Sequence, residues 1–439
     1  MVPDFYQVDY ACQTDVGVRR THNQDNLAAQ PAKDASYWQE RGHLFLVADG
    51  MGAHAVGELA SKLAADLIPH TYQKYAAHGP VQALHRAFQE ANATIHARGE
   101  QNPEFEGMGT TSTVLLLRPE GAWIAHVGDS RCYRVRDGII ELLSYDHSLQ
   151  WELARRQGKR PEQISGIPKN VIVRSLGPDV FVEVDVHGPH SVTPGDIYVL
   201  CSDGLSGRVS DAEIGAIAAA MPPEQACQLL VDLANIRGGP DNITVIVVRV
   251  PGRAPAELKG PRWGLAAFAK ALLRTWPAMC LLTGLASAVW TVYLILELRW
   301  PLYAWTFAGA TALLMAGALG FMWRQRRVSA EVPEYLAHPP VVHRRSSCQA
   351  SPALLQTLSS LRRELLQQAK ARGWTIAEDA LRTYLNQMQQ ALQAGELATA
   401  FRLECDILLE LMKPVRQERN KAEVFQPLWD VVGRDPEQL

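Results

Sequence analysis

Residues 43–54 read HLFLVADGMGAH, an apolar run that ends in an Asp-Gly turn. The apolar part predicts a buried strand. A single Asp-Gly pair usually forms only a turn, because both residues tolerate a left-handed backbone. Here an acidic residue adjoins four further apolar runs, in Asn23-Gln24-Asp25, Val127-Gly128-Asp129-Ser130, Cys201-Ser202-Asp203-Gly204 and Pro240-Asp241-Asn242. This repetition indicates that several strand ends converge on one acidic pocket.

Such a pocket predicts bound metal, because carboxylates that lie close together repel one another unless cations separate them. The clusters offer carboxylate, amide and carbonyl oxygens, which suit magnesium, manganese or calcium better than zinc or copper. An EF-hand does not fit, since the sequence has no Asp-x-Asp-x-Asp-Gly run with a distal Glu. Carboxylates drawn from distant strands instead indicate a two-metal hydrolytic centre.

The order and flanking residues of these clusters resemble the metal-dependent protein phosphatases, the type 2C serine/threonine class, in their bacterial form. The resemblance ends near residue 250. It is carried by Gly17-Val-Arg-Arg20 with Asn23-Gln24-Asp25, Asp49-Gly50-Met51-Gly52-Ala53-His54 with Gly57-Glu58-Leu59-Ala60-Ser61, Gly109-Thr110-Thr111, Val127-Gly128-Asp129-Ser130-Arg131, Asp146-His147-Ser148, Ser202-Asp203-Gly204 and Asp241-Asn242-Ile243-Thr244. Each motif is weak alone, and the ordered set is specific.

The resemblance implies an α+β fold, a four-layer α-β-β-α sandwich in which helices flank two antiparallel sheets. The sequence agrees, because amphipathic stretches at 57–75 and 80–98 predict helices. A capping box at Ser210–Glu213 predicts the start of another helix. The polar segment 149–169 is expected to form a flap beside the active site.

The resemblance also assigns metal ligands. Asp49 would bridge two manganese or magnesium ions, and the carbonyl oxygen of Gly50 would bind one of them. Asp203 and Asp241 would hold the other ion. Asp129, together with Asp203, would form a more labile third site.

Three residues would act on the substrate. Asp25, also counted with the metal site, would order metal-bound water for attack on phosphorus, so no covalent phosphoenzyme is expected. Arg20 would grip the phosphate, because a guanidinium fork fits that group; the neighbouring Arg19 is the alternative. His54 is a candidate general acid near the leaving oxygen, and its alternative role is packing at a helix start.

Two departures from the family pattern concern metal affinity and backbone freedom. Gln24 stands where many relatives carry Glu, which predicts weaker metal binding. Ala53 replaces a common Gly, which restricts the backbone if that position needs a positive φ.

A cysteine-based phosphatase mechanism is the competing interpretation, because Cys201 and Arg208 lie close in the sequence like the nucleophile loop of tyrosine phosphatases. That loop has five residues between Cys and Arg, whereas six intervene here, and the negative charge of Asp203 would destabilise a thiolate at Cys201.

Composition favours a multi-part intracellular protein. The chain has 439 residues and a net charge of −3, so no attraction to nucleic acid is expected. Its seven cysteines are scattered and odd in number, which predicts a reducing compartment. The first residues lack the pattern of a signal peptide.

Beyond residue 252 the sequence predicts a membrane anchor. The stretches 276–296 and 301–323 are apolar, free of charge and long enough to cross a bilayer. Tryptophans gather near their ends, and arginines at 324, 326 and 327 follow them, which places both flanks in the cytoplasm. A buried helical hairpin of a soluble domain is the alternative, which the lack of a polar face disfavours.

The C-terminal part predicts three amphipathic helices in a small antiparallel bundle. The first would end at Gly373, the second would begin at a Thr375–Glu378 capping box, and the third would stop at Pro414. The expected domains are a phosphatase domain at 1–252, a basic linker at 253–275, a transmembrane hairpin at 276–323, a linker at 324–350 and a helical cytoplasmic domain at 351–439.

Together these features predict a serine/threonine protein phosphatase in the bacterial inner membrane, with two spans and with the catalytic and C-terminal domains in the cytoplasm. Its partners would be phosphorylated proteins, the membrane and a serine/threonine kinase whose action it opposes. The alternative is a metal-binding pseudophosphatase that acts as a membrane scaffold or sensor. The presence of Arg20, Asp49, Asp203 and Asp241 favours the enzyme.

Overall fold

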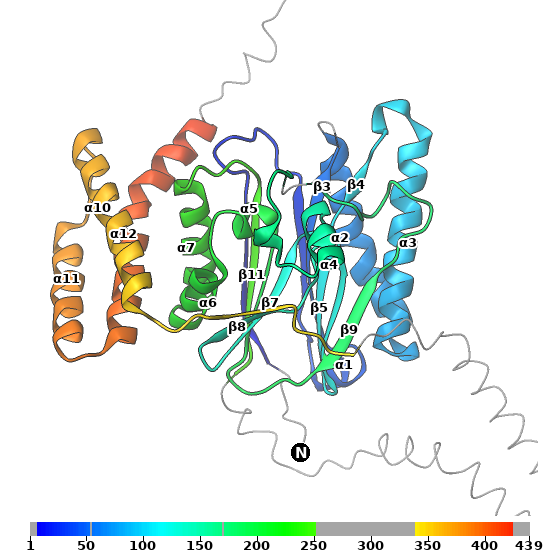
Figure 1. Ribbon diagram of the computed structural model, residues 1–439, viewed down its shortest axis with the longest axis horizontal. Helices are drawn as coiled ribbons and strands as arrows, with labels where there is room; N and C mark the ends of the chain where they lie inside the picture. The colour runs from blue at the N-terminus through cyan, green and yellow to red at the C-terminus, as the bar shows by residue number, and fades with distance from the viewer. Residues whose placement is uncertain (1–6, 53–54, 169–170, 252–338, 425–439) are drawn as a thin grey trace, which may run out of the picture. The chain divides into compact units, whose positions relative to one another are not determined.

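The computed structural model describes residues 7–52, 55–168, 171–251 and 339–424. The described strands form two antiparallel sheets with helices on their outer sides (Figure 1). The first sheet runs β1 (Asp9–Asp15), β11 (Ile243–Arg249), β10 (Ile197–Cys201), β7 (Arg131–Arg136), β8 (Ile139–Leu142) and β12 (Arg344–Ser347). The second runs β2 (Asp25–Gln30), β3 (His43–Met51), β5 (Ser112–Arg118), β6 (Gly121–Val127) and β9 (Asp185–His190), and β4 (Gly109–Thr110) pairs with β3.

Strand β3 explains why the two sheets stack. Its side chains alternate between the two faces of the sheet, as strand geometry requires. Leu44 and Leu46 pack under the helices α2 (Ala55–Tyr75) and α3 (Pro80–Gln101). Phe45 and Val47 point the other way and join the core between the sheets.

The first sheet is covered in the same manner by α6 (Asp211–Ala220) and α7 (Pro223–Ile236). The predicted capping box at the start of α6 is present, since the Ser210 and Glu213 side chains each bond the backbone of the other residue. The remaining described helices of this part are α1 (Ala35–Glu40), α4 (Leu149–Gln157), α5 (Asp203–Ser206) and short 3₁₀ turns at Ala76–His78, Pro103–Phe105 and Pro161–Gln163. The predicted α-β-β-α sandwich is confirmed.

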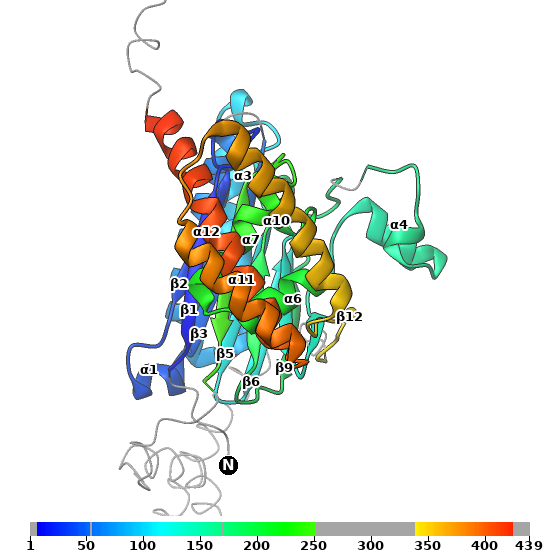
Figure 2. The same ribbon diagram turned by 90° about the vertical axis from the view of Figure 1, so that its left-hand side faces the viewer.

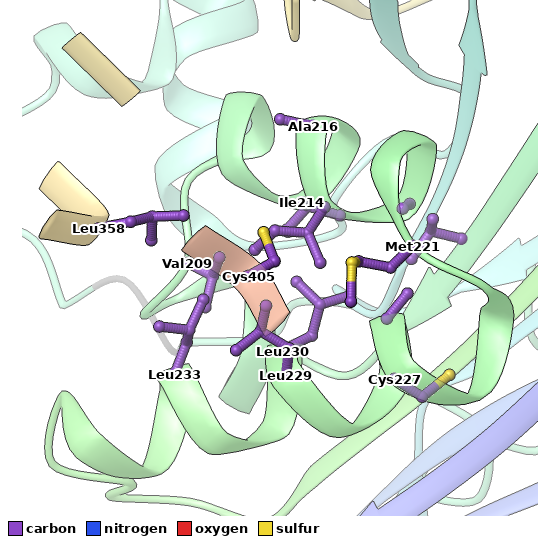
Figure 3. Packing of buried hydrophobic residues seen from close by; sticks show 14 of the residues in the cluster. Val209, Ile214, Ala216, Met221, Cys227, Leu229, Leu230, Leu233, Leu358 and Cys405 are labelled. Atoms are coloured by element: carbon purple, nitrogen blue, oxygen red, sulfur yellow. The ribbon is translucent and has the colours of Figure 1, made fainter. Parts of the chain in front are cut away.

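The C-terminal helices α10 (Pro352–Arg372), α11 (Glu378–Gln393) and α12 (Leu397–Val424) form a further layer over α6 and α7 (Figure 2). The sequence predicted a small antiparallel bundle, and α10 and α11 both pack against α12. In addition, Leu358 of α10 and Cys405 of α12 lie in one apolar cluster with Leu230 and Leu233 of α7 (Figure 3). The outer face of α7 is therefore buried by residues more than a hundred positions later in the chain.

Three boundaries differ from the sequence prediction. Helix α12 continues through Pro414, because Leu411 and Met412 are buried in the shared core and this packing outweighs one lost backbone bond. Helix α11 has no side-chain cap at its start, so the capping box predicted at Thr375 is wrong. Part of the predicted linker 324–350 forms β12, which extends the first sheet beside β8.

Within the described residues, no helix combines the length and apolar character needed to cross a bilayer. The predicted hairpin at 276–323 and the basic linker at 253–275 lie outside those residues.

Candidate metal and phosphate site

The acidic residues singled out from the sequence come from both sheets, some at the start of a strand and some at the end of an antiparallel neighbour. Asp25 opens β2 and stands directly opposite Asp49 of β3 in the strand register. Asp129 follows β6, Asp203 begins α5 just after β10, and Asp241 lies just before β11. Strand pairing therefore brings together residues that are far apart in the sequence.

A serine links the two sheets at this point. The Ser202 hydroxyl donates to Asp25 Oδ2 at 2.8 Å and accepts from the backbone N–H of Thr244 at 2.9 Å. The neighbouring backbones are in close contact, because a Cβ on Gly204 would lie 1.9 Å from the Asn242 carbonyl oxygen. The site thus requires glycine here, and the hydroxyl fixes the orientation of the Asp25 carboxylate.

The carboxylates raise one another's pKa values. Burial, with a smaller contribution from the charges of Asp203 and Asp241, raises the pKa of Asp25 to about 7 against the lowering effect of the Ser202 and Thr244 hydrogen bonds. Burial also raises the pKa of Asp49 well above its usual range, with repulsion from Asp25 and Asp203 adding to the shift. The pKa values of Asp129 and Asp203 are raised by the same two causes. Raised pKa values in four neighbouring carboxyl groups indicate a cation site, because a bound cation would stabilise their charged forms.

The donor atoms fit a hard divalent cation. Asp25 Oδ1, Asp129 Oδ1 and Asp203 Oδ1 are buried and make no hydrogen bond, so each keeps a lone pair available for a ligand. Among the described residues, no group of three or more His, Cys, Asp or Glu side chains is placed so that it could hold a metal ion. Magnesium-type ions commonly keep several waters and take only a few carboxylates, so this arrangement suits them better than a closed protein cage.

Arg20 lies at the edge of this cluster. Its Nη2 donates to Asp241 Oδ2 at 2.9 Å, and its side chain is 48% exposed. The structure therefore places Arg20 beside Asp241, and its role in binding phosphate stays a prediction. The alternative, Arg19, is also exposed.

The two remaining residues discussed from the sequence are His54 and Gln24. His54 lies outside the described residues, so its expected role stays a prediction. The Gln24 side-chain amide donates to the Gly52 carbonyl oxygen at 3.3 Å. That bond uses the amide nitrogen, and the predicted effect of Gln24 on metal affinity stays a prediction.

Asn242 has a role that the sequence analysis missed. Its amide nitrogen donates to the Val16 and His22 carbonyl oxygens at 2.8 and 2.9 Å, and its amide oxygen accepts from Gln24 N at 2.8 Å. It therefore ties the loop with Arg20 to the loop with Asp241. Its place next to Asp241 in a recognised motif was a signal that could have identified it.

A second residue that was not predicted is Arg131, which follows Asp129 by two positions. It makes a bidentate ion pair with Asp146, with Nη2 to Oδ2 at 2.7 Å. Its positive charge lowers the pKa of Asp129 and Asp203, against the larger effect of burial. Arg131 is thus a fixed countercharge beside the acidic cluster.

A cavity of about 520 Å³ adjoins the cluster. Its walls include Asp129, Asp203 and Arg131, together with Trp151 of α4 in the predicted flap and Arg344 of β12. It has room for residues that flank a phosphorylated side chain.

The Cys201 alternative does not fit the structure. Cys201 is fully buried, and burial raises the pKa of its thiol to about 12. A nucleophilic cysteine instead needs a lowered pKa and access to substrate.

Comparison with known proteins decides the family. The sequence profile described as protein phosphatase 2C matches residues 18–229. A putative protein phosphatase 2C-type from Streptococcus pyogenes is 35% identical over 241 residues, which are 54% of this chain and 95% of that protein. This chain belongs to the protein phosphatase 2C family. The predicted membership of this family is thereby confirmed.

Other members cover the same part of the chain. The serine/threonine protein phosphatase PstP of Mycobacterium tuberculosis is 35% identical over 55% of this chain, but the match spans only 45% of PstP. A solved structure of the PstP catalytic domain in complex with two manganese ions is 33% identical, covers 56% of this chain and 98% of that one, and has a TM-score of 0.48. The Streptococcus agalactiae serine/threonine phosphatase is 33% identical, covers 56% of this chain and all of that one, and has a TM-score of 0.50.

Proposed function

We propose that this chain is a membrane-tethered, metal-dependent phosphatase that hydrolyses phosphoserine and phosphothreonine in proteins. The observation that carries the proposal is the convergence of Asp25, Asp49, Asp129 and Asp203 beside Arg20. Buried oxygens without hydrogen-bond partners, next to one exposed guanidinium, suit a divalent cation and a phosphate that bind together.

The metal ligands follow from the positions of the acidic groups. Asp49, Asp203, Asp241 and the carbonyl oxygen of Gly50 would hold two manganese or magnesium ions, and Asp129 with Asp203 would serve a third. When bound, such ions supply positive charge for the phosphoryl oxygens and acidify a water.

The protein's own groups do the rest. Asp25 has its Oδ2 held by Ser202, so its Oδ1 is the atom that would orient the attacking water. Arg20 would exchange Asp241 for the substrate phosphate, to which it can donate two parallel hydrogen bonds. Arg131, held by Asp146, would limit the repulsion between the acidic cluster and an anionic substrate.

Phosphate release from a phosphothreonine peptide by the full-length chain tests this proposal. Activity should require manganese or magnesium, and Asp203→Asn should abolish most of it. The full chain is the right material, because removal of the C-terminal helices would expose the apolar outer faces of α6 and α7. Metal binding without any turnover would support the pseudophosphatase instead.

We also propose the cellular setting from the sequence. The apolar stretches 276–296 and 301–323 would anchor the protein in the inner membrane and return the chain to the cytoplasm. Both the phosphatase domain and the C-terminal helices would then reach phosphorylated proteins there and oppose a serine/threonine kinase.

A further inference from the structure

The last turns of α12 reach the loop that carries Arg20. We call residues 15–20 the arginine loop. The Arg419 Nη2 donates to Asp15 Oδ1 at 2.6 Å and to the Gly17 carbonyl oxygen at 3.0 Å. Two residues separated by 404 positions are thus in direct contact.

Asp15 is the acceptor around which the arginine loop turns. Besides Arg419, the same Oδ1 atom accepts from the Gly17 backbone N–H at 2.8 Å and from Asn235 Nδ2 at 3.1 Å. Arg419 brings the only cation among these donors, and hydrogen bonds to charged groups are the stronger ones. It therefore contributes strongly to the conformation of this turn.

The arginine loop, held in this turn, fixes the position of a second loop. We call this second loop, residues 238–242, the acidic loop. Gly17 has φ +83°, and a Cβ there would lie 2.2 Å from the Asp241 carbonyl oxygen. The Val18 N–H donates to the Gly239 carbonyl oxygen at 3.0 Å. The arginine loop and the acidic loop are consequently in direct contact, and together they carry Arg20 and Asp241.

Helix α12 is itself firmly held. Arg416 forms an ion pair with Asp232 of α7, and Leu408 and Met412 are buried in the core shared with that helix. Helix α7 leads directly into the acidic loop. The end of α12 is therefore docked on the same element that positions Asp241.

We propose that Arg419 is a positioning residue that holds the arginine loop for phosphate binding, so that docking of the C-terminal helices sets the affinity for phosphorylated substrate. This inference rests on the proposed function. It concerns a part of the chain outside the similarity to PstP, which covers 55% of the sequence. A signal that shifts α12 would change phosphate affinity without touching the metal ligands.

The kinetic test uses the full-length chain at saturating manganese with a phosphothreonine peptide. Arg419→Ala should raise KM, and the inhibition constant of inorganic phosphate with it, by about fivefold, the loss expected for a charged hydrogen bond at a partly exposed site. The kcat should change less than about twofold, because the affected interaction holds phosphate before and during reaction alike. Arg419→Lys should recover part of the affinity, since an ammonium can reach one acceptor but lacks the fork.

Arg416→Ala is the matched control. It lies on the same helix, is 27% exposed against 23% for Arg419, and pairs with α7 instead of the arginine loop. It should lower the melting temperature but leave KM unchanged when KM is measured at a temperature well below melting, where α12 stays docked and Arg419 keeps its contact with Asp15. An equal rise of KM in both variants would reveal a general loosening and overturn the positioning role, as would an unchanged KM in folded Arg419→Ala.

Hydrogen exchange tests the same inference without catalysis. In Arg419→Ala the amides of Gly17 and Val18 should exchange several times faster than in the parent chain, because both take part in the bonds described above. Unchanged exchange would refute the inference whatever the activity. If the parent chain releases no phosphate, the proposed function fails, and the exchange result still decides whether Arg419 holds the loop.

Discussion

Replacement of Arg416 by Met should weaken the docking of α12 in a way that depends on pH. Asp232 is 3% exposed, and burial raises the pKa of its carboxyl to about 7, while Arg416 pulls that pKa down. A folded-state pKa above the unfolded value of about 3.9 means that the folded chain binds the proton more tightly. The resulting stability is complete below the unfolded value and is lost as the pH rises through about 7.

Without Arg416 the pKa of Asp232 should rise further. The substitution should therefore lower the free energy of unfolding mainly at pH values where the Asp232 carboxyl of the parent protein is ionised. At pH 8.5 we expect the free energy of unfolding to fall by about 2 kcal/mol, which is the typical contribution of a hydrogen bond to a charged group when the arginine is partly buried. At pH 5.5 the carboxyl is protonated in both proteins, and the loss should fall below about 0.5 kcal/mol. The difference corresponds to a shift in melting temperature of about 2 °C for a chain of this length.

Thermal unfolding of the full-length chain, followed by circular dichroism at both pH values, measures these losses. Asp232→Asn is the control, because an amide keeps the shape of the side chain and cannot titrate. In that background Arg416→Met should cost the same at both pH values. Equal losses at pH 5.5 and 8.5 in the parent background would refute the reasoning, because they would show that the Asp232 proton is not linked to docking.

Three further predictions concern the active site and the membrane. EDTA should abolish phosphate release and manganese should restore it, and Asp203→Asn should reduce turnover by orders of magnitude through loss of a metal-holding charge; full activity in EDTA would contradict the metal assignment. Arg20→Ala should mainly raise KM, with partial recovery in Arg20→Lys; a large effect of Arg19→Ala instead would identify the wrong arginine. A cysteine at position 299 should react with a membrane-impermeant reagent on intact cells, whereas one at the exposed Ser36 should stay protected until the membrane is opened, and recovery of the chain in the soluble fraction would exclude the anchor.

The sequence predicted the catalytic layers well because local patterns determine them. The buried strand predicted from the apolar run at 43–48 and the capping box at Ser210 depend on near neighbours, and both are present in the structure. The acidic cluster was also predictable, since each carboxylate follows or precedes a strand and antiparallel pairing places such ends together. These features need only periodicity and turn chemistry.

The C-terminal part was predicted less well because long-range packing decides it. Nothing near Pro414 in the sequence shows that Leu411 and Met412 will be buried against α7, and that burial keeps the helix intact. The contact of Arg419 with Asp15 joins the two ends of the described chain, and an arginine on a polar helix face is usually a solvated charge. Asn242 was overlooked because its role lies in hydrogen bonds to two other loops.

Helices α10 to α12 are synthesised well after α6 and α7, which they cover, and this order matters during synthesis on the ribosome. The outer faces of α6 and α7 leave the exit tunnel long before the helices that cover them, and at bacterial-type rates of about 5–20 residues per second the delay is on the order of ten seconds. During that interval the nascent chain carries an uncovered apolar surface. We predict that chains stalled near residue 300 are held by a general chaperone, and that chains stalled on a C-terminal extension long enough for α12 to leave the tunnel are released. Crosslinking of stalled nascent chains to the chaperone measures this. Equal crosslinking at both lengths would show that the chaperone does not bind the uncovered apolar faces of α6 and α7.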